Sequence, residues 1–317
     1  MDNISERKKS TRGREGGKIK RTSGGQGLRK IVQAGWAVIT NGYMKAFSPD
    51  GPMIYQGPLK QVCTPGMNCY SCPGALGSCP IGSMQAVLSG RSRVFPFYVV
   101  GYLALIGLFV GRFICGWLCI FGLIQELLYK IPTPKLRVPE GPDRILRYLK
   151  YGILLVMVVG LPLLYRNEVG AGDPFFCKYI CPVGTLEGGV PLMILNDTLR
   201  NVIGWLFAWK FLILVICIAA SIFIYRPFCK YICPLGAFYG LFQKVSLVRM
   251  RHHESLCVDC GLCAKKCRMD VDPRVSPNSS ECIRCRECIK ACPMSALSMG
   301  IGSGDNVTEA EEGGKVV

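Results

Sequence analysis

Long apolar stretches alternate with charged segments along this chain of 317 residues. Residues 94–110 carry no charge, residues 148–165 contain only Lys150, and residues 202–225 contain only Lys210. Each stretch approaches or exceeds the roughly 20 residues that cross a bilayer core of about 30 Å as a helix. A fourth stretch, 31–47, is interrupted by polar residues and is either a span or an interfacial helix. The pattern predicts an all-α membrane domain of about four transmembrane helices over residues 30–250.

Composition favours a membrane protein, because 50% of the residues are hydrophobic, 19% are charged and the mean hydropathy is +0.30. The formal net charge of +17 carries information on orientation. Residues 1–30 contain ten Lys or Arg against three acidic residues, and six more basic residues lie between 112 and 147. The positive-inside rule therefore predicts a multi-pass protein of the cell membrane with both termini in the cytoplasm. The loops at 49–93 and 166–200 are then expected outside.

Both ends of the chain are expected to be disordered. Residues 1–29 are basic and contain Gly and Ser without an apolar run, and residues 301–317 are acidic. The basic tail has too few aromatic residues to stack on bases, so no nucleic-acid partner is expected. Attraction to anionic lipid is the interpretation that this tail favours.

Eight cysteines between residues 257 and 292 follow a spacing of x2, x2 and x3, written twice. This is the bacterial two-cluster ferredoxin spacing, in which the fourth cysteine of each run binds the other cluster. Zinc sites and disulfides fit less well, because neither requires a third ligand and an x3 step in a repeated pattern. One departure is that Arg268 follows Cys267 where proline is usual. The pattern predicts a two-cluster α+β ferredoxin domain over residues 251–300, with one 4Fe-4S cluster on Cys257, Cys260, Cys263 and Cys292 and the other on Cys282, Cys285, Cys288 and Cys267.

Eleven cysteines remain, and six of them form pairs with an x3 step: Cys115 with Cys119, Cys177 with Cys181, and Cys229 with Cys233. The last two pairs share the sequence Cys-Lys-Tyr-Ile-Cys-Pro. An x3 step is expected to place both sulfurs on one face of a helical turn. Metal ligation is the interpretation that we favour. Disulfide bonds are an alternative for the outer-loop cysteines if that side of the membrane is oxidising. Cys217 is expected to be a small buried hydrophobe.

Several of these motifs together resemble a known family. They are Cys69-x2-Cys72-Pro followed by Cys79-Pro, the segment Gly-Arg-Phe-Ile-Cys-Gly-Trp-Leu-Cys ending at Cys119, the Cys229 motif and the ferredoxin run. The combination is similar to the membrane polyferredoxins related to NapH and NosR, over roughly residues 30–295. The resemblance implies an integral membrane iron-sulfur protein that moves electrons between a cytoplasmic donor or a quinone pool and redox partner proteins at or beyond the membrane. Ile120 stands where the family usually has proline, and the large flavin-binding domain of NosR is not seen, so NapH is the closer comparison.

One or two further iron-sulfur clusters are therefore expected in the membrane domain. The predicted topology favours an inner cluster on Cys115, Cys119, Cys229 and Cys233. It favours an outer cluster on Cys72, Cys79, Cys177 and Cys181, with Cys69 as the substitute ligand and Cys63 unassigned. A rival pairing joins the two repeated motifs, Cys177 and Cys181 with Cys229 and Cys233.

Other cofactors and chemistries find little support. The chain has only two histidines, His252 and His253, which lie outside the apolar stretches and are expected in a polar linker, so no haem is predicted. No catalytic residue set is visible. Lys210 is interpreted as a lysine that snorkels to the surface, the alternative being a counter-charge for a cluster or a quinone contact. Glu126 is expected on a solvated helix face.

The function predicted is therefore electron transfer. One alternative is an accessory or regulatory membrane iron-sulfur protein that senses redox state or assists maturation of a partner reductase. Another is a subunit of a quinone-reactive oxidoreductase complex.

Overall fold

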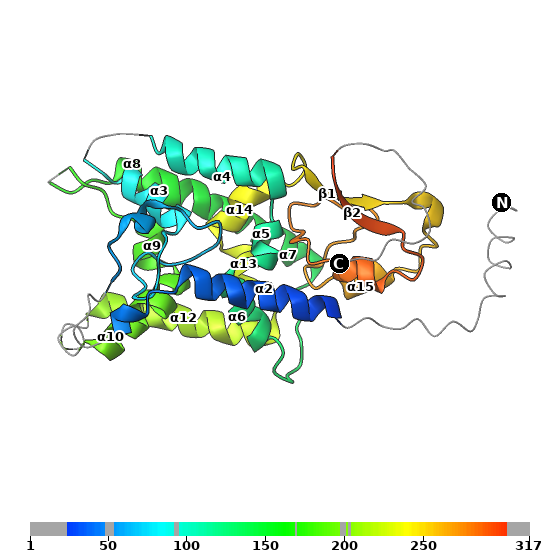
Figure 1. Ribbon diagram of the computed structural model, residues 1–317, viewed down its shortest axis with the longest axis horizontal. Helices are drawn as coiled ribbons and strands as arrows, with labels where there is room; N and C mark the ends of the chain where they lie inside the picture. The colour runs from blue at the N-terminus through cyan, green and yellow to red at the C-terminus, as the bar shows by residue number, and fades with distance from the viewer. Residues whose placement is uncertain are drawn as a thin grey trace, which may run out of the picture.

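The computed structural model describes residues 24–47, 54–91, 95–168, 170–196, 201 and 204–302. The molecule is elongated, with a helical body at one end of its long axis and a small two-stranded sheet at the other (Figure 1). The tail predicted to be disordered comprises residues 1–29, of which residues 1–23 lie outside the described residues. Residues 24–29 form the start of a helix, so the prediction is wrong for them. The predicted C-terminal tail lies outside the described residues from position 303 onward.

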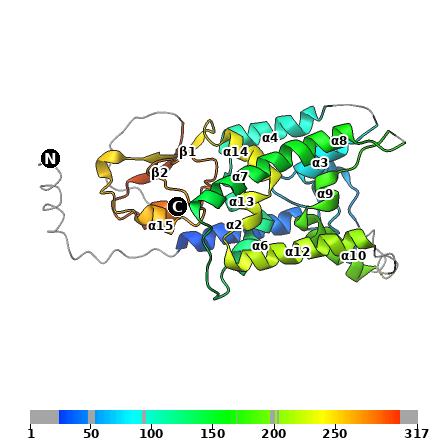
Figure 2. The ribbon, with the colours of Figure 1, turned by 180° about the vertical axis from the view of Figure 1, so that it is seen from behind.

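The longest helices of the body run along the long axis of the molecule (Figures 1 and 2). They are α2 (Gly24–Thr40), α4 (Phe97–Val110), α7 (Glu140–Ile153) continued by the π-helix η4 (Leu154–Gly160) and α8 (Leu161–Leu164), and α12 (Trp205–Phe223). Shorter helices lie between them: η2 (Met44–Phe47), η3 (Pro58–Gln61), α3 (Pro80–Leu88), α5 (Phe113–Trp117), α6 (Ile120–Leu128), α9 (Phe175–Tyr179), η5 (Gly184–Gly189), α10 (Val190–Leu195), α13 (Pro227–Tyr231) and α14 (Pro234–Phe242).

The prediction of four transmembrane helices is wrong for the described part of the chain. Two helical segments are long and apolar enough to cross a bilayer, Gly141–Leu164 and Trp205–Phe223. Helix α4 has 14 residues, because the chain leaves the helix at Gly111, whose φ of 52° favours glycine. Helix α2 has 17 residues and an amphipathic pattern, and it ends at Thr40 rather than continuing to residue 47.

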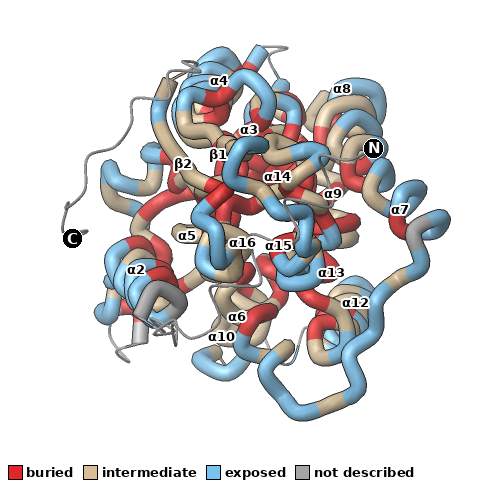
Figure 3. The backbone as a smooth tube through the Cα atoms, turned by 90° about the vertical axis from the view of Figure 1, so that its right-hand side faces the viewer, coloured by how far each residue is buried: buried red, intermediate tan, exposed pale blue. Residues whose placement is uncertain are grey.

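The helical body nevertheless exposes apolar side chains along its outer faces. On α12, Leu212, Val215 and Ile216 are 50%, 46% and 58% exposed. Figure 3 shows the long helices at the periphery with their outward faces pale blue and their inward faces red. Continuous apolar surface of this kind is costly in water and is typical of contact with lipid.

The C-terminal unit contains the strands β1 (Val248–His252) and β2 (Leu297–Ile301), which pair antiparallel with Met250 opposite Met299. The helices η6 (Glu254–Leu256), α15 (Leu262–Lys266) and α16 (Glu287–Ala291) lie between the strands in sequence, and α15 packs against α16. Because β1 begins at Val248, this unit starts before the boundary predicted at residue 251. The chain is thus a mostly helical body followed by a small unit with one sheet.

Candidate iron-sulfur sites

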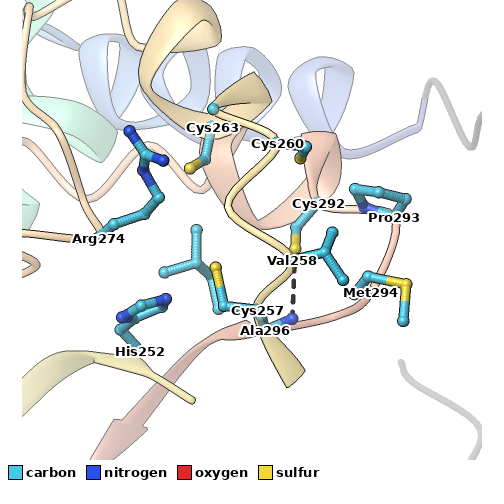
Figure 4. Close-up of a pocket in the computed structure, with 12 residues that line it drawn as sticks. His252, Cys257, Val258, Cys260, Cys263, Arg274, Cys292, Pro293, Met294 and Ala296 are labelled. Carbon is cyan, nitrogen blue, oxygen red and sulfur yellow. Dashed lines mark hydrogen bonds between the residues drawn. The ribbon is translucent and has the colours of Figure 1, made fainter. Parts of the chain in front are cut away.

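Two cavities in the C-terminal unit divide its eight cysteines into two groups of four. Cys257, Cys260, Cys263 and Cys292 line the first cavity (Figure 4). The second is lined by Cys267, Cys282, Cys285 and Cys288. In both groups, three cysteines come from one run and the fourth comes from the other run. The structure therefore brings together the same sets of four that the spacing predicts.

The first cavity lies nearer the surface than the second. Cys260 is exposed, and the thiol of Cys292 accepts a hydrogen bond from the Ala296 amide at 3.3 Å (Figure 4). In the second cavity, burial raises the pKa of the Cys285 and Cys288 thiols to about 12. Both side chains would be neutral thiols at pH 7 without bound iron, so loading of this site is expected to release protons.

Arg268, which stands where proline is usual after Cys267, contacts the helical body. Its guanidinium lies over the rings of Tyr129 and Tyr225, 5.9 and 5.6 Å from the ring centroids. Both tyrosines belong to the helical body, so Arg268 contributes a cation–π contact between the two parts of the molecule.

The helical body contains a third group of four buried cysteines, which we call the inner set: Cys115, Cys119, Cys229 and Cys233. Cys119 lies within electrostatic range of Cys229 and Cys115, and Cys233 lies within range of the other three. The expectation that each pair shares one helical turn is wrong in detail. Cys119 and Cys233 have extended backbones and are the N-cap residues of α6 and α14. Their thiols accept hydrogen bonds from the amides of Gly122 and Gly236 at 3.4 and 3.3 Å, as an N-cap acceptor does.

A fourth group, the outer set, surrounds a cavity of about 370 Å³: Cys69, Cys79, Cys177 and Cys181. Cys79 caps α3 and is followed by proline, and Cys181 likewise directly precedes a helical segment. Cys72 is not among the residues that line the cavity, and its thiol faces the Asn41 side chain at 3.7 Å. The structure thus puts Cys69, the predicted substitute, in the position assigned to Cys72. Lys210 also lines this cavity, which favours the counter-charge interpretation over snorkelling.

The rival pairing of the repeated motifs does not match this geometry. Cys177 lies within electrostatic range of Cys69 and Cys79 in the outer set. Cys229 instead lies within range of Cys115 in the inner set. Each copy of the Cys-Lys-Tyr-Ile-Cys-Pro motif therefore joins a different group.

The second C-terminal cavity lies directly against the inner set. The α5 turn that carries Cys115 packs on the 282–285 loop, where the Trp117 indole donates to the Arg284 carbonyl at 3.1 Å. A Cβ atom at Gly116 would lie 2.3 Å from the Ile283 carbonyl oxygen, so only glycine allows this approach. The side chain of Gln243 completes the contact by donating to the Cys282 carbonyl at 2.8 Å.

A short loop connects the inner set to the outer set. A Cβ atom at Gly66 would lie 3.5 Å from the Cα atom of Cys119, and the sulfur of Met67 lies 4.0 Å from the thiol of Cys79. The Tyr239 hydroxyl donates to the Pro65 carbonyl at 2.9 Å and fixes this loop on α14. The second C-terminal group, the inner set and the outer set therefore follow one another along the molecule. The packing of α15, which carries Cys263, against α16, which carries Cys288, joins the first C-terminal group to the second.

Buried ion pairs surround the inner set. The guanidinium of Arg226 donates to the Cys115 carbonyl and pairs with Glu126 at 2.8 Å, and Arg29 pairs with the same carboxylate at 2.7 Å. Glu126 is 3% exposed, so its prediction as a solvated residue is wrong. Its partners lie about a hundred positions away in sequence, where a local helical pattern cannot reveal them.

A second ionic group joins the C-terminal unit to the helical body. Glu281, next to Cys282, pairs with Arg112 at 3.0 Å and with Lys150 at 2.5 Å, and all three side chains are buried. Arg112 also donates to the Cys229 carbonyl at 3.2 Å. Sequence reasoning missed this group, and the one available signal was the lone Lys150 in an apolar stretch.

The remaining candidates have varied positions. His252 lines the first C-terminal cavity from β1, and His253 hydrogen-bonds to the Ser298 hydroxyl at 2.9 Å, so neither lies in a free linker. Cys217 is buried in α12, as expected of a small hydrophobe, and Cys63 is buried outside the four groups.

Comparison with known proteins identifies two matching regions. A 4Fe-4S binding domain family matches the helical body at residues 94–139, 152–190 and 205–251, and a second 4Fe-4S binding domain family matches residues 275–298. Over these residues the chain is similar to ferredoxin-type 4Fe-4S proteins. The predicted resemblance to membrane-associated polyferredoxins is confirmed at this level. No solved structure matches the chain.

Three relatives illustrate the range of this group. Uncharacterized protein MJ0750 of Methanocaldococcus jannaschii is 31% identical over 167 residues, covering 52% of this chain and 61% of the relative. Regulatory protein NosR of Pseudomonas aeruginosa is 30% identical over 52% of this chain and 21% of its own length. Methylamine utilization ferredoxin-type protein MauN of Methylorubrum extorquens is 26% identical over 61% of this chain and 58% of its own length. The chain therefore spans less than two thirds of each of these relatives.

Proposed function

We propose that this protein is a membrane iron-sulfur protein that carries electrons along four 4Fe-4S clusters. The supporting observation is the serial arrangement of the four cysteine groups, in which packed segments join each group to the next. The first C-terminal group, the second C-terminal group, the inner set and the outer set would each hold one cluster. Four thiolates per site suit a cube in which each iron takes one protein ligand.

The donor chemistry of the sites fits this assignment. Among the described residues, no three His, Cys, Asp or Glu side chains approach one point closely enough to hold a single metal ion. The thiols of the two C-terminal groups and of the outer set instead line cavities, which suits a polynuclear cluster rather than mononuclear zinc. Bound clusters would supply one-electron redox chemistry without making or breaking bonds in a substrate.

The protein's own residues would hold the clusters in a fixed series and keep water away. Arg112 and Arg226 are fully buried beside the inner set. Their positive charge would offset the negative charge of a thiolate-bound cluster. At the outer set, Lys178 and Lys210 line the cavity, and Lys178 pairs with Asp173 at 2.6 Å. The exposed position of Cys260 makes the first C-terminal site the natural point of contact with a soluble redox protein.

The orientation that we propose places the C-terminal unit and the N-terminus in the cytoplasm and the outer set at the opposite surface. Two spans, Gly141–Leu164 and Trp205–Phe223, return the chain to the side on which it began. The shorter helices α2 and α4 run along the same axis, and the segment between them carries Cys69 and Cys79 to the outer set (Figures 1 and 2). The C-terminal unit lies at the same end of the molecule as the start of α2 (Figure 1). The basic residues Arg137 and Arg147 also contact this unit, as the positive-inside rule requires.

Reporter fusions test this orientation. A reporter fused after residue 190, between the two spans, is expected to be active only outside, and one fused after residue 300 is expected to be active only in the cytoplasm. A cytoplasmic signal at residue 190 would contradict the proposed orientation.

Electron transfer across a sealed membrane tests the function itself. Proteoliposomes are loaded with ferricyanide and treated outside with dithionite, and oxidant consumption is followed in vesicles whose C-terminal unit faces out. Wild type is expected to consume ferricyanide at least tenfold faster than the Cys229→Ser variant. The matched control is Cys217→Ser, because Cys217 is buried in α12 but belongs to none of the four groups. Equal rates in all three proteins would overturn the proposal.

A regulatory role is the second candidate, and the similarity to NosR, a relative named as a regulatory protein, is the observation that favours it. A sensor would hold the same clusters but would not need to pass electrons from one surface to the other. The liposome experiment separates the two roles, because a sensor predicts no ferricyanide consumption above that of the Cys229→Ser variant. A quinone pool remains a candidate donor within the electron-transfer proposal.

A further inference from the structure

Two glutamines occupy equivalent places in the inner and outer sets. Gln125 lies six positions after Cys119, in the helix that Cys119 caps, and Gln85 lies six positions after Cys79, in the helix that Cys79 caps. Gln125 is 1% exposed and Gln85 is 0% exposed. An uncharged polar side chain is rarely buried this fully unless its hydrogen bonds are satisfied.

Each amide makes the same three hydrogen bonds. Nε2 of Gln125 donates to the Cys229 thiol at 3.2 Å and to the Phe121 carbonyl at 3.3 Å, and Oε1 accepts from the Phe228 amide at 3.2 Å.

In the outer set, Nε2 of Gln85 donates to the Cys177 thiol at 3.4 Å and to the Ile81 carbonyl at 3.5 Å, and Oε1 accepts from the Phe176 amide at 3.0 Å. In both sets the carbonyl lies four positions earlier in the same helix, and the amide belongs to the residue that precedes the cysteine.

These contacts fix which end of each side chain faces the sulfur. A backbone N–H can only donate, so the residue before the cysteine must face the oxygen of the glutamine. The amide nitrogen is therefore turned toward the thiol, with its second hydrogen used by the helix carbonyl. The donor is held in place by protein contacts on both sides.

We propose that Gln125 and Gln85 are positioning residues that raise the reduction potentials of the inner and outer clusters by donating N–H···S hydrogen bonds. This inference rests on the proposed function, since it assigns Cys229 and Cys177 as cluster ligands. A hydrogen bond to a ligand sulfur withdraws negative charge, so it stabilises the reduced and more negative cluster more than the oxidised one. Removing the donor is expected to shift the potential of that site to a more negative value.

Redox titration followed by EPR, on anaerobically purified protein in detergent, tests the proposal. Gln125→Met keeps the length of the side chain but removes the donor, and it is expected to change the reduced-to-oxidised ratio of the inner cluster about tenfold at a fixed potential. That change corresponds to about 59 mV for a one-electron couple. Gln85→Met is expected to shift the outer cluster alone, so each variant is the control for the other.

A second substitution keeps the test decisive if methionine prevents folding. Gln125→Glu retains an oxygen for the Phe228 amide and, as a carboxylate, removes the donor and adds negative charge, so the inner potential is again expected to fall. Unchanged potentials in variants with full iron content would overturn the roles of these glutamines and leave the proposed function intact. A wild-type protein without clusters in the helical body would overturn both.

Discussion

Replacing Cys69 with serine is expected to remove the outer cluster, whereas replacing Cys72 with serine is expected to leave it in place. The reason is that Cys69 lines the outer cavity with Cys79, Cys177 and Cys181, while the thiol of Cys72 faces Asn41. Iron and sulfide analysis of the two variants gives the result directly. The Cys69→Ser protein should lose about four iron atoms per chain, the content of one cube.

The two substitutions are well matched, because both cysteines lie in the same loop and both are partly buried. Loss of iron in Cys72→Ser with full iron in Cys69→Ser would contradict the assignment.

The double substitution of Cys229 and Cys233 tests the inner set in the same way. It should remove one cluster and leave the cluster on Cys177 unchanged, whereas loss of both would support the rival pairing of the repeated motifs.

Replacing Glu281 with glutamine is expected to produce the largest loss of stability. Its carboxylate lies between Arg112 and Lys150, and both cations are 0% exposed. Removing one partner from a buried ionic group leaves uncompensated charge and typically costs about 3–5 kcal/mol. Thermal unfolding in detergent measures the effect, and limited proteolysis should show earlier release of the C-terminal unit.

Two further variants make this result specific. Glu254→Gln removes an exposed carboxylate from the same unit and is expected to change stability by about 0.5 kcal/mol or less. Adding Lys150→Met to Glu281→Gln removes one of the two unpaired cations and should recover part of the loss. A Glu281→Gln protein as stable as wild type would show that this ionic group does not hold the two parts together.

The sequence predicted the features that depend on local spacing. The two runs of cysteines near the C-terminus have a spacing that a loop around a cube dictates, and the structure brings together the predicted sets of four. The membership of the inner set was also predictable, because a topology argument put its two motifs at the same end of the helical body. Each motif is written within a few consecutive residues, but the pairing of Cys115 and Cys119 with Cys229 and Cys233 came from the predicted topology.

Features that depend on distant contacts were not predictable in this way. Glu126 looks like a solvated residue in its own helix, and only the packing of α2 and α13 brings Arg29 and Arg226 to it. The choice between Cys69 and Cys72 depends on how a loop folds over α2. The number of spans was overestimated because an apolar run does not reveal the bounds of its helix: α4 begins at Phe97 rather than at residue 94, and α2 ends at Thr40 rather than at residue 47.

The iron and acid-labile sulfide content of anaerobically purified wild-type protein tests the central claim most directly. Four cubes predict about 16 iron and about 16 sulfide per chain, with the C-terminal unit supplying half. The same measurement on a Cys115→Ser variant should give about 12 of each. A fully reconstituted wild-type protein with about 8 iron and about 8 sulfide would contradict the account, because the cysteines of the helical body would then hold no clusters.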